Sequence, residues 1–273
     1  INEYFEAKLK LFSKNLSDKF VYIDSEWGNK VKENSVIPSF KIGNNNDSNL
    51  RILEEKLFPN INLKIQINED KHDINLNVTG PNFNLNFLLA LSMAYFSEQL
   101  NIQNYEENFR NIRNPKGRFE IINYKSNKIV VDYAHTPDAI KTTVDFVTQY
   151  FSNVIVIFGA GGDRDTEKRL LMGNATKNAD KIIITNDNPR HEDPEKIAND
   201  ILEGCDKENT VVILDRKEAI TYGINQLKEN SVLLVLGKGH EMHQEIKNKK
   251  INFNDFDYIS DLLGDINLSL IHI

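Results

Sequence analysis

From about residue 112 onward, short apolar runs alternate with amphipathic stretches. The apolar runs are rich in β-branched residues and predict strands at 119–122, 129–132, 154–158, 181–185, 210–214 and 232–236. The stretches between them predict helices near 137–150, 166–178, 194–203 and 217–228. Strands that alternate with helices form a parallel sheet covered on both faces, so we expect an α/β domain here.

The first part of the chain has a different pattern. We expect an amphipathic helix at 3–14, strands at 20–23, 36–41, 61–67 and 74–78, and helices at 84–99 and 105–111. The alternation of Ile74, Leu76 and Val78 predicts a half-solvated antiparallel sheet. A basic, polar segment with Pro115 and Gly117 follows. We therefore place two domains at residues 1–111 and 112–273.

Lys8 stands out within the first predicted helix. Phe5, Leu9 and Phe12 form one apolar stripe, and Lys8 lies on it by helical spacing. A lysine on an apolar stripe usually extends its amine to the surface. The alternative is a desolvated amine that is neutral enough to react.

Charged or glycine-rich segments follow five consecutive strands of the predicted parallel sheet. They begin at Asp132, Gly159, Asp187, Asp215 and Gly237. The carboxyl ends of parallel strands meet at one edge of a sheet, where ligands bind. Five such segments favour a binding site at this edge.

Each segment alone has a plainer interpretation. Pro189 stiffens the turn that presents Arg190, which suits capture of a carboxylate or phosphate, but a solvated loop arginine is the commoner case. The loop at 159–162 could cradle an anion, although a tight strand-to-helix turn is favoured. His135 is equally compatible with a ligand contact and with a histidine at a helix start.

Composition narrows the possible partners and compartment. A net charge of −7 argues against nucleic-acid binding, so an anionic ligand must meet local cations. Cys205 is the only cysteine, which excludes an internal disulfide and a cysteine-cluster metal site. The apolar run at 87–96 is shorter than the ~20 residues that a membrane helix needs, and no signal sequence opens the chain. We expect a cytoplasmic protein without membrane insertion, and a monomer. Because the sequence begins with Ile1 and not with a methionine, we also expect it to be a fragment of a longer protein.

Six motifs together resemble the Mur ligase family, in its branch that adds meso-diaminopimelate. They occur in the family's order and are Gly-Arg-Phe-Glu at 117–120, Asp-Tyr-Ala-His-Thr-Pro-Asp at 132–138, Phe-Gly-Ala-Gly-Gly-Asp-Arg-Asp at 158–165, Lys-Arg-Leu-Leu-Met at 168–172, Asp-Asn-Pro-Arg at 187–190 and Gly-Lys-Gly-His-Glu at 237–241. The resemblance covers nearly the whole chain and is weaker over residues 1–111. It implies the end of a central α/β ATPase domain followed by a complete C-terminal Rossmann-like domain. The family's P-loop would precede Ile1, so we expect the fragment to be inactive alone.

The resemblance also implies a reaction and its substrates. ATP would phosphorylate the carboxylate of UDP-MurNAc-L-Ala-D-Glu, and the amine of meso-diaminopimelate would then form the amide. Lys8 is similar to the family's carbamylated lysine, which helps position Mg²⁺. The implied ATP contacts are Asn84, Arg118, Asp132 and His135. The implied amino-acid contacts are Arg164, Asn188, Pro189, Arg190, Gly237 and Glu241.

Within the implied amino-acid site, two residues decide the substrate. Meso-diaminopimelate carries a distal ammonium and carboxylate, whereas lysine carries only the ammonium. Arg190 would clamp the carboxylate and Glu241 would take the ammonium. Two alternatives stay open, which are a lysine-adding ligase and a non-catalytic module that binds a nucleotide or an amino acid.

Overall fold

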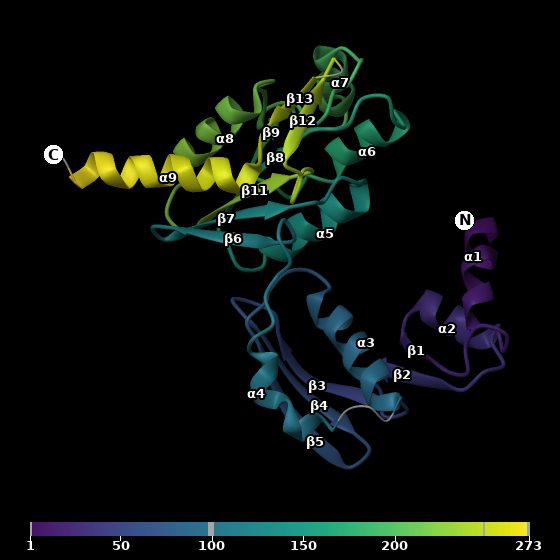
Figure 1. The fold of residues 1–273 in the computed structure, drawn as a ribbon. Helices are drawn as coiled ribbons and strands as arrows, with labels where there is room; N and C mark the ends of the chain where they lie inside the picture. The colour runs from purple at the N-terminus through teal and green to yellow at the C-terminus, as the bar shows by residue number, and fades with distance from the viewer. Residues whose placement is uncertain (1, 98–100, 248, 272–273) are drawn as a thin grey trace. The chain divides into compact units, whose positions relative to one another are not determined.

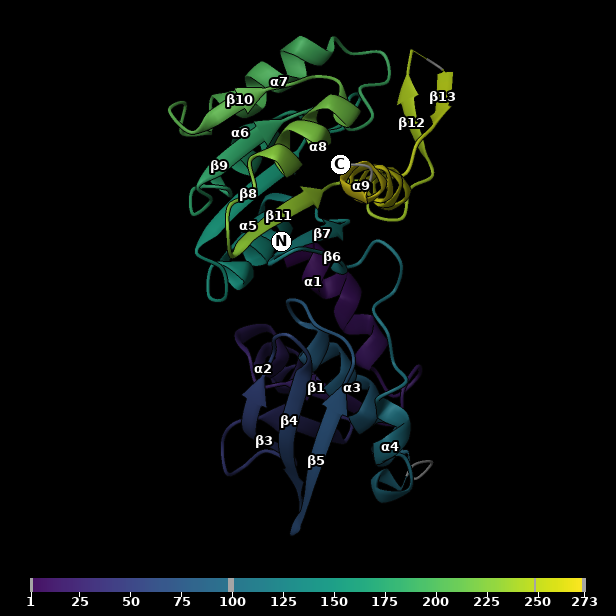
Figure 2. The same cartoon turned by 90° about the vertical axis from the view of Figure 1, so that its left-hand side faces the viewer.

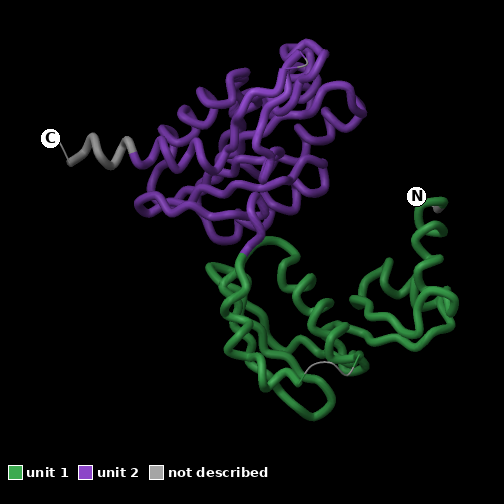
Figure 3. Tube along the Cα trace, in the orientation of Figure 1, with its two compact units in different colours: residues 1–113 green, residues 114–273 purple. Residues whose placement is uncertain are grey.

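The chain forms two compact units, residues 1–113 and residues 114–273 (Figures 1 and 3). A computed structural model describes residues 2–97, 101–247 and 249–271. The observed division falls two residues after the expected one at 111/112. Among the described residues, no helix has the length and apolar character needed to cross a membrane.

The second unit contains a six-stranded sheet in the order β10-β9-β8-β11-β7-β6. Five strands are parallel, and only β6 runs antiparallel, against β7. This confirms the mostly parallel α/β architecture. The strands are β6 (Glu120–Tyr124), β7 (Asn127–Asp132), β8 (Asn153–Phe158), β9 (Lys181–Ile184), β10 (Thr210–Val212) and β11 (Ser231–Leu236).

Helices cover both faces of this sheet (Figure 2). Alternate strand residues such as Ile155 and Ile157 pack with residues of α8 (Arg216–Asn225) and α9 (Asp255–Ile271). The intervening residues are equally buried, and α5 (Pro137–Val147) contacts β8 and β11 on the sheet. Two-sided burial explains why these strands read as continuous apolar runs.

Capping residues set where the helices of the second unit begin. The Thr136 side chain accepts a hydrogen bond from the Ala139 N–H and is followed by a proline at the first turn. Asp193 caps α7 (Pro194–Leu202) in the same way, while α6 spans Glu167–Asn174. A side-chain cap with proline at the first helical position fixes a helix start. These starts place the preceding loops at the carboxyl edge of the sheet.

Two elements of the second unit were not predicted. A hairpin of β12 (His243–Ile246) and β13 (Lys249–Asn252) follows β11, and α9 comes after it. The hairpin is polar and half-buried or exposed, so it lacks an apolar alternation that a sequence reading would detect. An isolated parallel bridge joins Ile246 to Arg190.

The first unit contains a five-stranded sheet in the order β1-β2-β3-β4-β5. The expected antiparallel meander is correct only for β3 to β5, because β1, β2 and β3 are parallel. Ile61, Leu63, Ile65 and Ile67 of β4 are buried, while the residues between them are half-buried or exposed. The strands are β1 (Phe20–Ile23), β2 (Ser39–Gly43), β3 (Leu50–Lys56), β4 (Ile61–Ile67) and β5 (Asp70–Leu76).

Helices of the first unit pack on or beside this sheet. Leu88 and Leu91 of α3 (Phe83–Phe96) belong to the same core as the strands. Positions 98–99 of the expected helix lie outside the described residues. The remaining helices are α1 (Asn2–Leu9), a 3-10 turn at Lys10–Phe12, α2 (Glu26–Glu33), a 3-10 turn at Ile102–Asn104 and α4 (Glu106–Phe109).

Candidate functional site

A cavity of about 280 Å³ lies at the carboxyl edge of the second sheet. It is lined by segments that follow four of the five parallel strands. Six predicted site residues are among its lining, which consists of Tyr133, His135, Gly159, Ala160, Gly161, Arg164, Lys168, Asp187, Asn188, Arg190, Gly237 and Glu241. Pockets for drug-sized ligands usually span about 300–1,000 Å³, so this cavity suits a smaller molecule.

Glycines bring the loops of the cavity into close contact. A Cβ at Gly159 would lie 2.0 Å from the carbonyl oxygen of Thr185. A Cβ at Gly162 would lie equally close, 2.0 Å, to the carbonyl oxygen of Pro189. The glycine loop is thus required for tight packing against the turn after β9, and not for the tight strand-to-helix turn expected from the sequence, because α6 begins only at Glu167. Pro189 shapes this contact and does not line the cavity.

Gly237 is needed for two reasons. Its φ of 108° is strained for a residue with a side chain, and a Cβ there would lie 2.6 Å from Oδ2 of Asp187. The carboxyl of Asp187 is buried, and burial raises its pKa, while Arg216 and Lys238 oppose that rise. Gly237 therefore makes room for the buried carboxyl of Asp187, which begins one of the five segments expected at this edge and was given no ligand contact of its own.

A buried hydrogen-bond network holds Glu241. The Lys238 amine, which is 0% exposed, donates to Glu241 Oε2 at 2.8 Å and to Asn188 Oδ1 at 3.2 Å. Asn188 Nδ2 also donates to Glu241 Oε2 at 2.9 Å. Both of these bonds to Glu241 end on Oε2, so among the described contacts Oε1 is the oxygen available to a ligand.

The same network sets the protonation state of Glu241. Burial pushes the pKa of its carboxyl up, but hydrogen bonds from Lys238 and Asn188 outweigh burial and hold the pKa below its ordinary value. Glu241 is therefore an anion at neutral pH. Lys238 was not predicted as a site residue, although it belongs to the Gly-Lys-Gly-His-Glu motif.

Arg190 is held in a fixed but strained position. Its φ is 51°, which is uncommon for a residue other than glycine. Its Nη1 donates to the Gly162 carbonyl at 2.6 Å, and its Nε lies 3.3 Å from Oε2 of Glu245. The stiff arginine turn inferred from the sequence exists, but it already has a carboxylate partner from the β12 strand.

A second cluster lies beside the cavity around Tyr133. The Arg118 guanidinium stacks over the Tyr133 ring with 4.5 Å to the centroid, and the rings of His135 and His240 lie 4.6 and 5.2 Å away. His135 Nδ1 is 2.7 Å from the Tyr133 carbonyl oxygen. The structure thus groups the predicted Arg118 and His135 around an aromatic residue that sequence reasoning missed.

Asp132 orders the backbone of this cluster. Its carboxylate accepts hydrogen bonds from the N–H groups of Phe119 at 2.7 Å and Ala134 at 2.9 Å. Burial raises the pKa of Asp132, and these two bonds together with the charge of Arg118 act against that rise. Two accepted bonds tie the chain before β6 to the segment after β7, so Asp132 positions Arg118 and Tyr133.

The segment after β10 does not join the cavity, contrary to the convergence of all five strand ends expected from the sequence. Arg216 is buried, and it donates to Asp255 through Nε at 2.7 Å and Nη2 at 2.8 Å. Nη2 also donates to the Leu236 carbonyl at 2.9 Å. Arg216 therefore joins the starts of α8 and α9 to the end of β11.

Arg169 fixes two of the loops around the cavity in place. It is fully buried and donates to Asp200 and Glu192, each at 2.9 Å. Oε1 of Glu192 also accepts the N–H of Asp163 at 2.5 Å. Arg169 thereby fixes the loop after β8 against the loop after β9, a role that the sequence alone did not reveal.

Comparison with known proteins identifies this arrangement. Residues 117–239 match the family described as "Mur ligase, glutamate ligase domain". They are a Mur ligase C-terminal domain.

A named ligase has a similar sequence over most of this chain. The UDP-N-acetylmuramoyl-L-alanyl-D-glutamate–2,6-diaminopimelate ligase of Aquifex aeolicus is 36% identical and matches 97% of this chain. The match covers 55% of that ligase, so this chain spans about half of its length.

Solved structures agree with the fold. A structure titled with the same ligase name aligns at a TM-score of 0.66 and 27% identity, over 97% of this chain and 57% of that one. The MurF ligase of Thermotoga maritima in complex with ADP aligns at 0.62, over 86% of this chain and 53% of that one, and at 12% identity shows the fold alone.

Outside the Mur ligase C-terminal domain, Asn84 lies in the first unit. It is buried at the start of α3, and its Nδ2 donates to Oε2 of Glu55 at 2.8 Å. It lines a cavity of about 410 Å³ together with residues at the carboxyl ends of β1 and β2, among them Asp24 and Gly43. The parallel pairing of these strands makes that edge a suitable place for a ligand.

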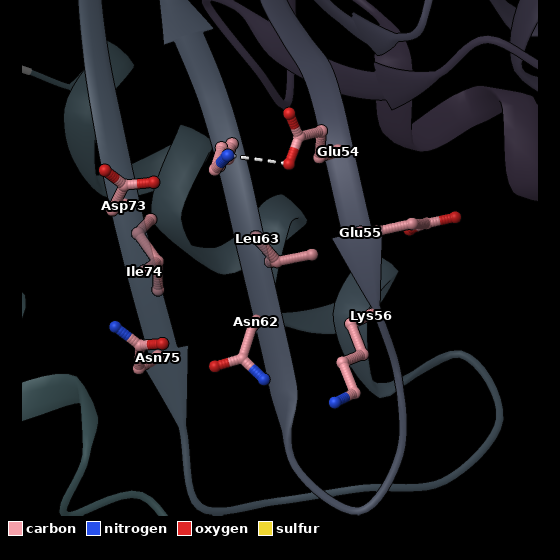
Figure 4. A pocket seen from close by; sticks show the side chains of 9 residues that line it. Glu54, Glu55, Lys56, Asn62, Leu63, Asp73, Ile74 and Asn75 are labelled. Atoms are coloured by element: carbon pink, nitrogen blue, oxygen red, sulfur yellow. Dashed lines mark ion pairs between the residues drawn. The ribbon is translucent and has the colours of Figure 1, made fainter.

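Another hollow of the first unit lies over the strands β3 to β5 (Figure 4). Its charged residues are of mixed sign, with Glu54, Glu55 and Asp73 beside Lys56 and Lys64, and Lys64 pairs with Glu54 at 2.7 Å. None of the predicted site residues lines it. We assign it no role, because a strand face of mixed charge is an ordinary solvated surface.

The structure agrees with the plainer interpretation of Lys8, in which its amine extends to the surface, and not with a desolvated amine. Phe5, Leu9 and Phe12 do form the half-buried side, where Phe5 contacts Trp27, but Lys8 is exposed with its amine 5.4 Å from the Tyr4 ring centroid. Helical spacing placed Lys8 at the margin of the stripe, where its long side chain turns to solvent. Among the described residues, no group of three or more His, Cys, Asp or Glu side chains is arranged to hold a metal ion.

Proposed function

We propose that this chain is part of an ATP-dependent ligase that adds meso-diaminopimelate to UDP-MurNAc-L-Ala-D-Glu in peptidoglycan synthesis. The names of the similar sequences support this proposal. The observation that carries it is that Arg190 and Glu241 line one small cavity, since a diamino acid offers each of them a group of opposite charge.

In the proposed reaction, the γ-phosphoryl group of ATP passes to the D-glutamyl carboxylate, which gives an acyl phosphate and ADP. The unprotonated amine of the diamino acid then attacks the acyl carbon. Phosphate leaves with the bonding electron pair, the amine loses a proton, and an amide is formed. Such a reaction depends on positioning and on cationic groups near the phosphates.

The cavity would bind the distal end of the diamino acid, which carries the second ammonium and carboxylate. Glu241 would pair with the distal ammonium through Oε1, and Arg190 would pair with the distal carboxylate. Arg164 and Lys168 also line the cavity and would attract the carboxylates. Asn188 and Gly237 would act through geometry, because Asn188 positions Glu241 and Gly237 makes room for Asp187.

Each unit contains residues that the family resemblance implies as nucleotide contacts. Arg118, Asp132 and His135 lie around Tyr133 in the second unit, and Asn84 lines the strand-end cavity of the first. The proposed use of ATP and a nucleotide-linked precursor implies a cytoplasmic location.

The decisive experiment is ligation by the full-length gene product. We expect it to consume ATP and join meso-diaminopimelate to UDP-MurNAc-L-Ala-D-Glu, with one phosphate released per amide. Binding of nucleotide and amino acid without product would instead establish the non-catalytic module. Equal kcat/KM for meso-diaminopimelate and L-lysine would contradict the role given to Arg190.

The lysine-adding alternative also has a specific observation in its favour. Glu245 already gives Arg190 a carboxylate partner, so an amino acid without a distal carboxylate would not leave Arg190 unpaired. The two amino acids should therefore be tested side by side with the same enzyme.

A further inference from the structure

Two nitrogens of the Arg190 guanidinium already have partners, the Gly162 carbonyl and the Glu245 carboxylate. Nη1 is bound to the Gly162 carbonyl at 2.6 Å, and Nε lies 3.3 Å from Glu245 Oε2. A bidentate contact with a carboxylate uses two nitrogens on one edge of the guanidinium. With Nη1 occupied, the edge formed by Nε and Nη2 is the one suited to a ligand carboxylate, and Glu245 already contacts it.

Main-chain hydrogen bonds hold Glu245 in this place. The Arg190 N–H donates to the Glu245 carbonyl at 3.1 Å, and the Lys247 N–H donates to the Arg190 carbonyl at 2.8 Å. The Glu245 N–H donates to Asn188 Oδ1 at 2.8 Å. These bonds fasten β12 to the turn after β9, so the Glu245 side chain is presented to Arg190 by the backbone.

The pair is open enough to exchange partners. The side chains of Arg190 and Glu245 are 22% and 31% exposed, and a single nitrogen–oxygen contact at 3.3 Å joins them. Partly exposed ion pairs with one such contact are weak. A carboxylate that reaches Arg190 through the cavity can therefore displace Glu245.

We propose that Glu245 is a specificity-determining residue, an internal carboxylate that competes with the distal carboxylate of the amino-acid substrate for Arg190. This inference rests on the proposed function of the cavity. When the substrate carries a distal carboxylate, Glu245 has to yield its place. When the substrate lacks one, Glu245 keeps Arg190 paired and spares it the cost of a half-buried charge without a partner. Glu245 thus reduces the preference of the enzyme for diamino acids with a distal carboxylate over lysine.

The test is the substitution Glu245→Gln in the full-length enzyme. It removes the charge and keeps the main-chain bonds and the approximate side-chain volume. We expect the ratio of kcat/KM for meso-diaminopimelate to kcat/KM for L-lysine to rise roughly three- to tenfold, which corresponds to about 0.7–1.4 kcal/mol. KM for ATP should not change. Thermal unfolding would show that the variant is folded.

Two further variants make the result specific. Glu229→Gln removes an exposed carboxylate just before β11, at the opposite end of that strand from the cavity, and should leave the ratio unchanged. In an Arg190→Gln background, Glu245→Gln should have no effect on the ratio, because the group that it competes for is gone.

The outcomes separate this inference from the proposed function. An active enzyme whose ratio stays constant or falls in Glu245→Gln overturns the role of Glu245 alone. A rise that persists in the Arg190→Gln background also overturns it, since the effect would not pass through Arg190. A parent enzyme that joins neither amino acid contradicts the proposed function itself.

Discussion

Arg190 and Arg216 follow neighbouring parallel strands, yet they have different environments. Arg216 has two nitrogen–oxygen contacts with Asp255, at 2.7 and 2.8 Å, and both side chains are at most 1% exposed. Arg190 has a single contact with Glu245, at 3.3 Å, in a cavity wall. The same residue type at the same edge of one sheet is closed off in one case and accessible in the other.

The difference shows what a charge at a strand end can and cannot indicate. A buried pair with two contacts is part of the fold, because neither partner can reach a ligand. An accessible pair with one contact can exchange its partner, so it can serve binding. Substitution of each arginine should therefore have a different main effect, on stability for Arg216 and on substrate use for Arg190.

Arg216→Ala should cause the largest loss of stability. It leaves Asp255 as a buried carboxylate without its partner, which typically costs about 3–5 kcal/mol. Chemical unfolding should show this drop in the free energy of unfolding, whereas Arg190→Ala should cost less than about 1 kcal/mol. Similar losses for both variants would remove the distinction between the two arginines.

Arg190→Gln should act on catalysis and hardly on folding. It removes the charge-assisted bonds to the distal carboxylate, each worth about 1.5–3 kcal/mol, so kcat/KM for meso-diaminopimelate should fall roughly ten- to a hundredfold. The same measurement with L-lysine is the control and should change little. An equal fall with both amino acids would show that Arg190 does not read the distal carboxylate.

Lys238→Met should change the pH range over which Glu241 is charged. In the parent protein the pKa of Glu241 is lowered, so its contribution to stability is complete above the ordinary value of about 4.3 and is lost as the pH falls through the folded value. Removal of the Lys238 hydrogen bond should raise that pKa. NMR titration of the Glu241 carboxyl carbon would measure the shift, and an unmoved midpoint would contradict the network described above.

Tyr133→Leu should have the smallest effect. It removes the ring over which Arg118 stacks, a contact worth about 0.5–1 kcal/mol at an exposed site, so KM for ATP should rise roughly two- to fivefold. Tyr124→Leu is the matched control, because Lys125 stacks over Tyr124 at the opposite end of β6 and far from the ligand edge. Equal changes in both variants would mean that Tyr133 has no part in nucleotide binding.

The six-stranded sheet of the second unit was readable from the sequence because its central strands, such as β8 and β11, are apolar and buried on both faces. All six strands of this sheet were predicted within a few residues. The first unit was harder. Strand β3 was missed because its last residues, Glu54, Glu55 and Lys56, are charged and exposed. The polar hairpin of β12 and β13 was missed for a similar reason.

The site was only partly readable for a different reason. In a parallel sheet the segments that follow the strands meet at one edge, and half of the twelve residues that line the cavity were named without a structure. Pairing could not be foreseen, because Lys238 meets Asn188, which lies 50 positions earlier in the chain. Whether a charged residue faces a cavity or a buried partner depends on such contacts. That is why Arg190 and Arg216 looked alike in the sequence.

The bridge between Arg190 and the β12 strand has a consequence for how the substrate preference of the proposed ligase could be altered. The bonds that fix position 245 use its main-chain N–H and carbonyl, so they persist with any side chain except proline. The hairpin therefore holds the backbone of residue 245 in the same place whichever side chain it carries. A different residue at 245 would retune which amino acid the cavity prefers while the frame around Arg190 stays in place, which makes this single position a starting point for redesigning the substrate range.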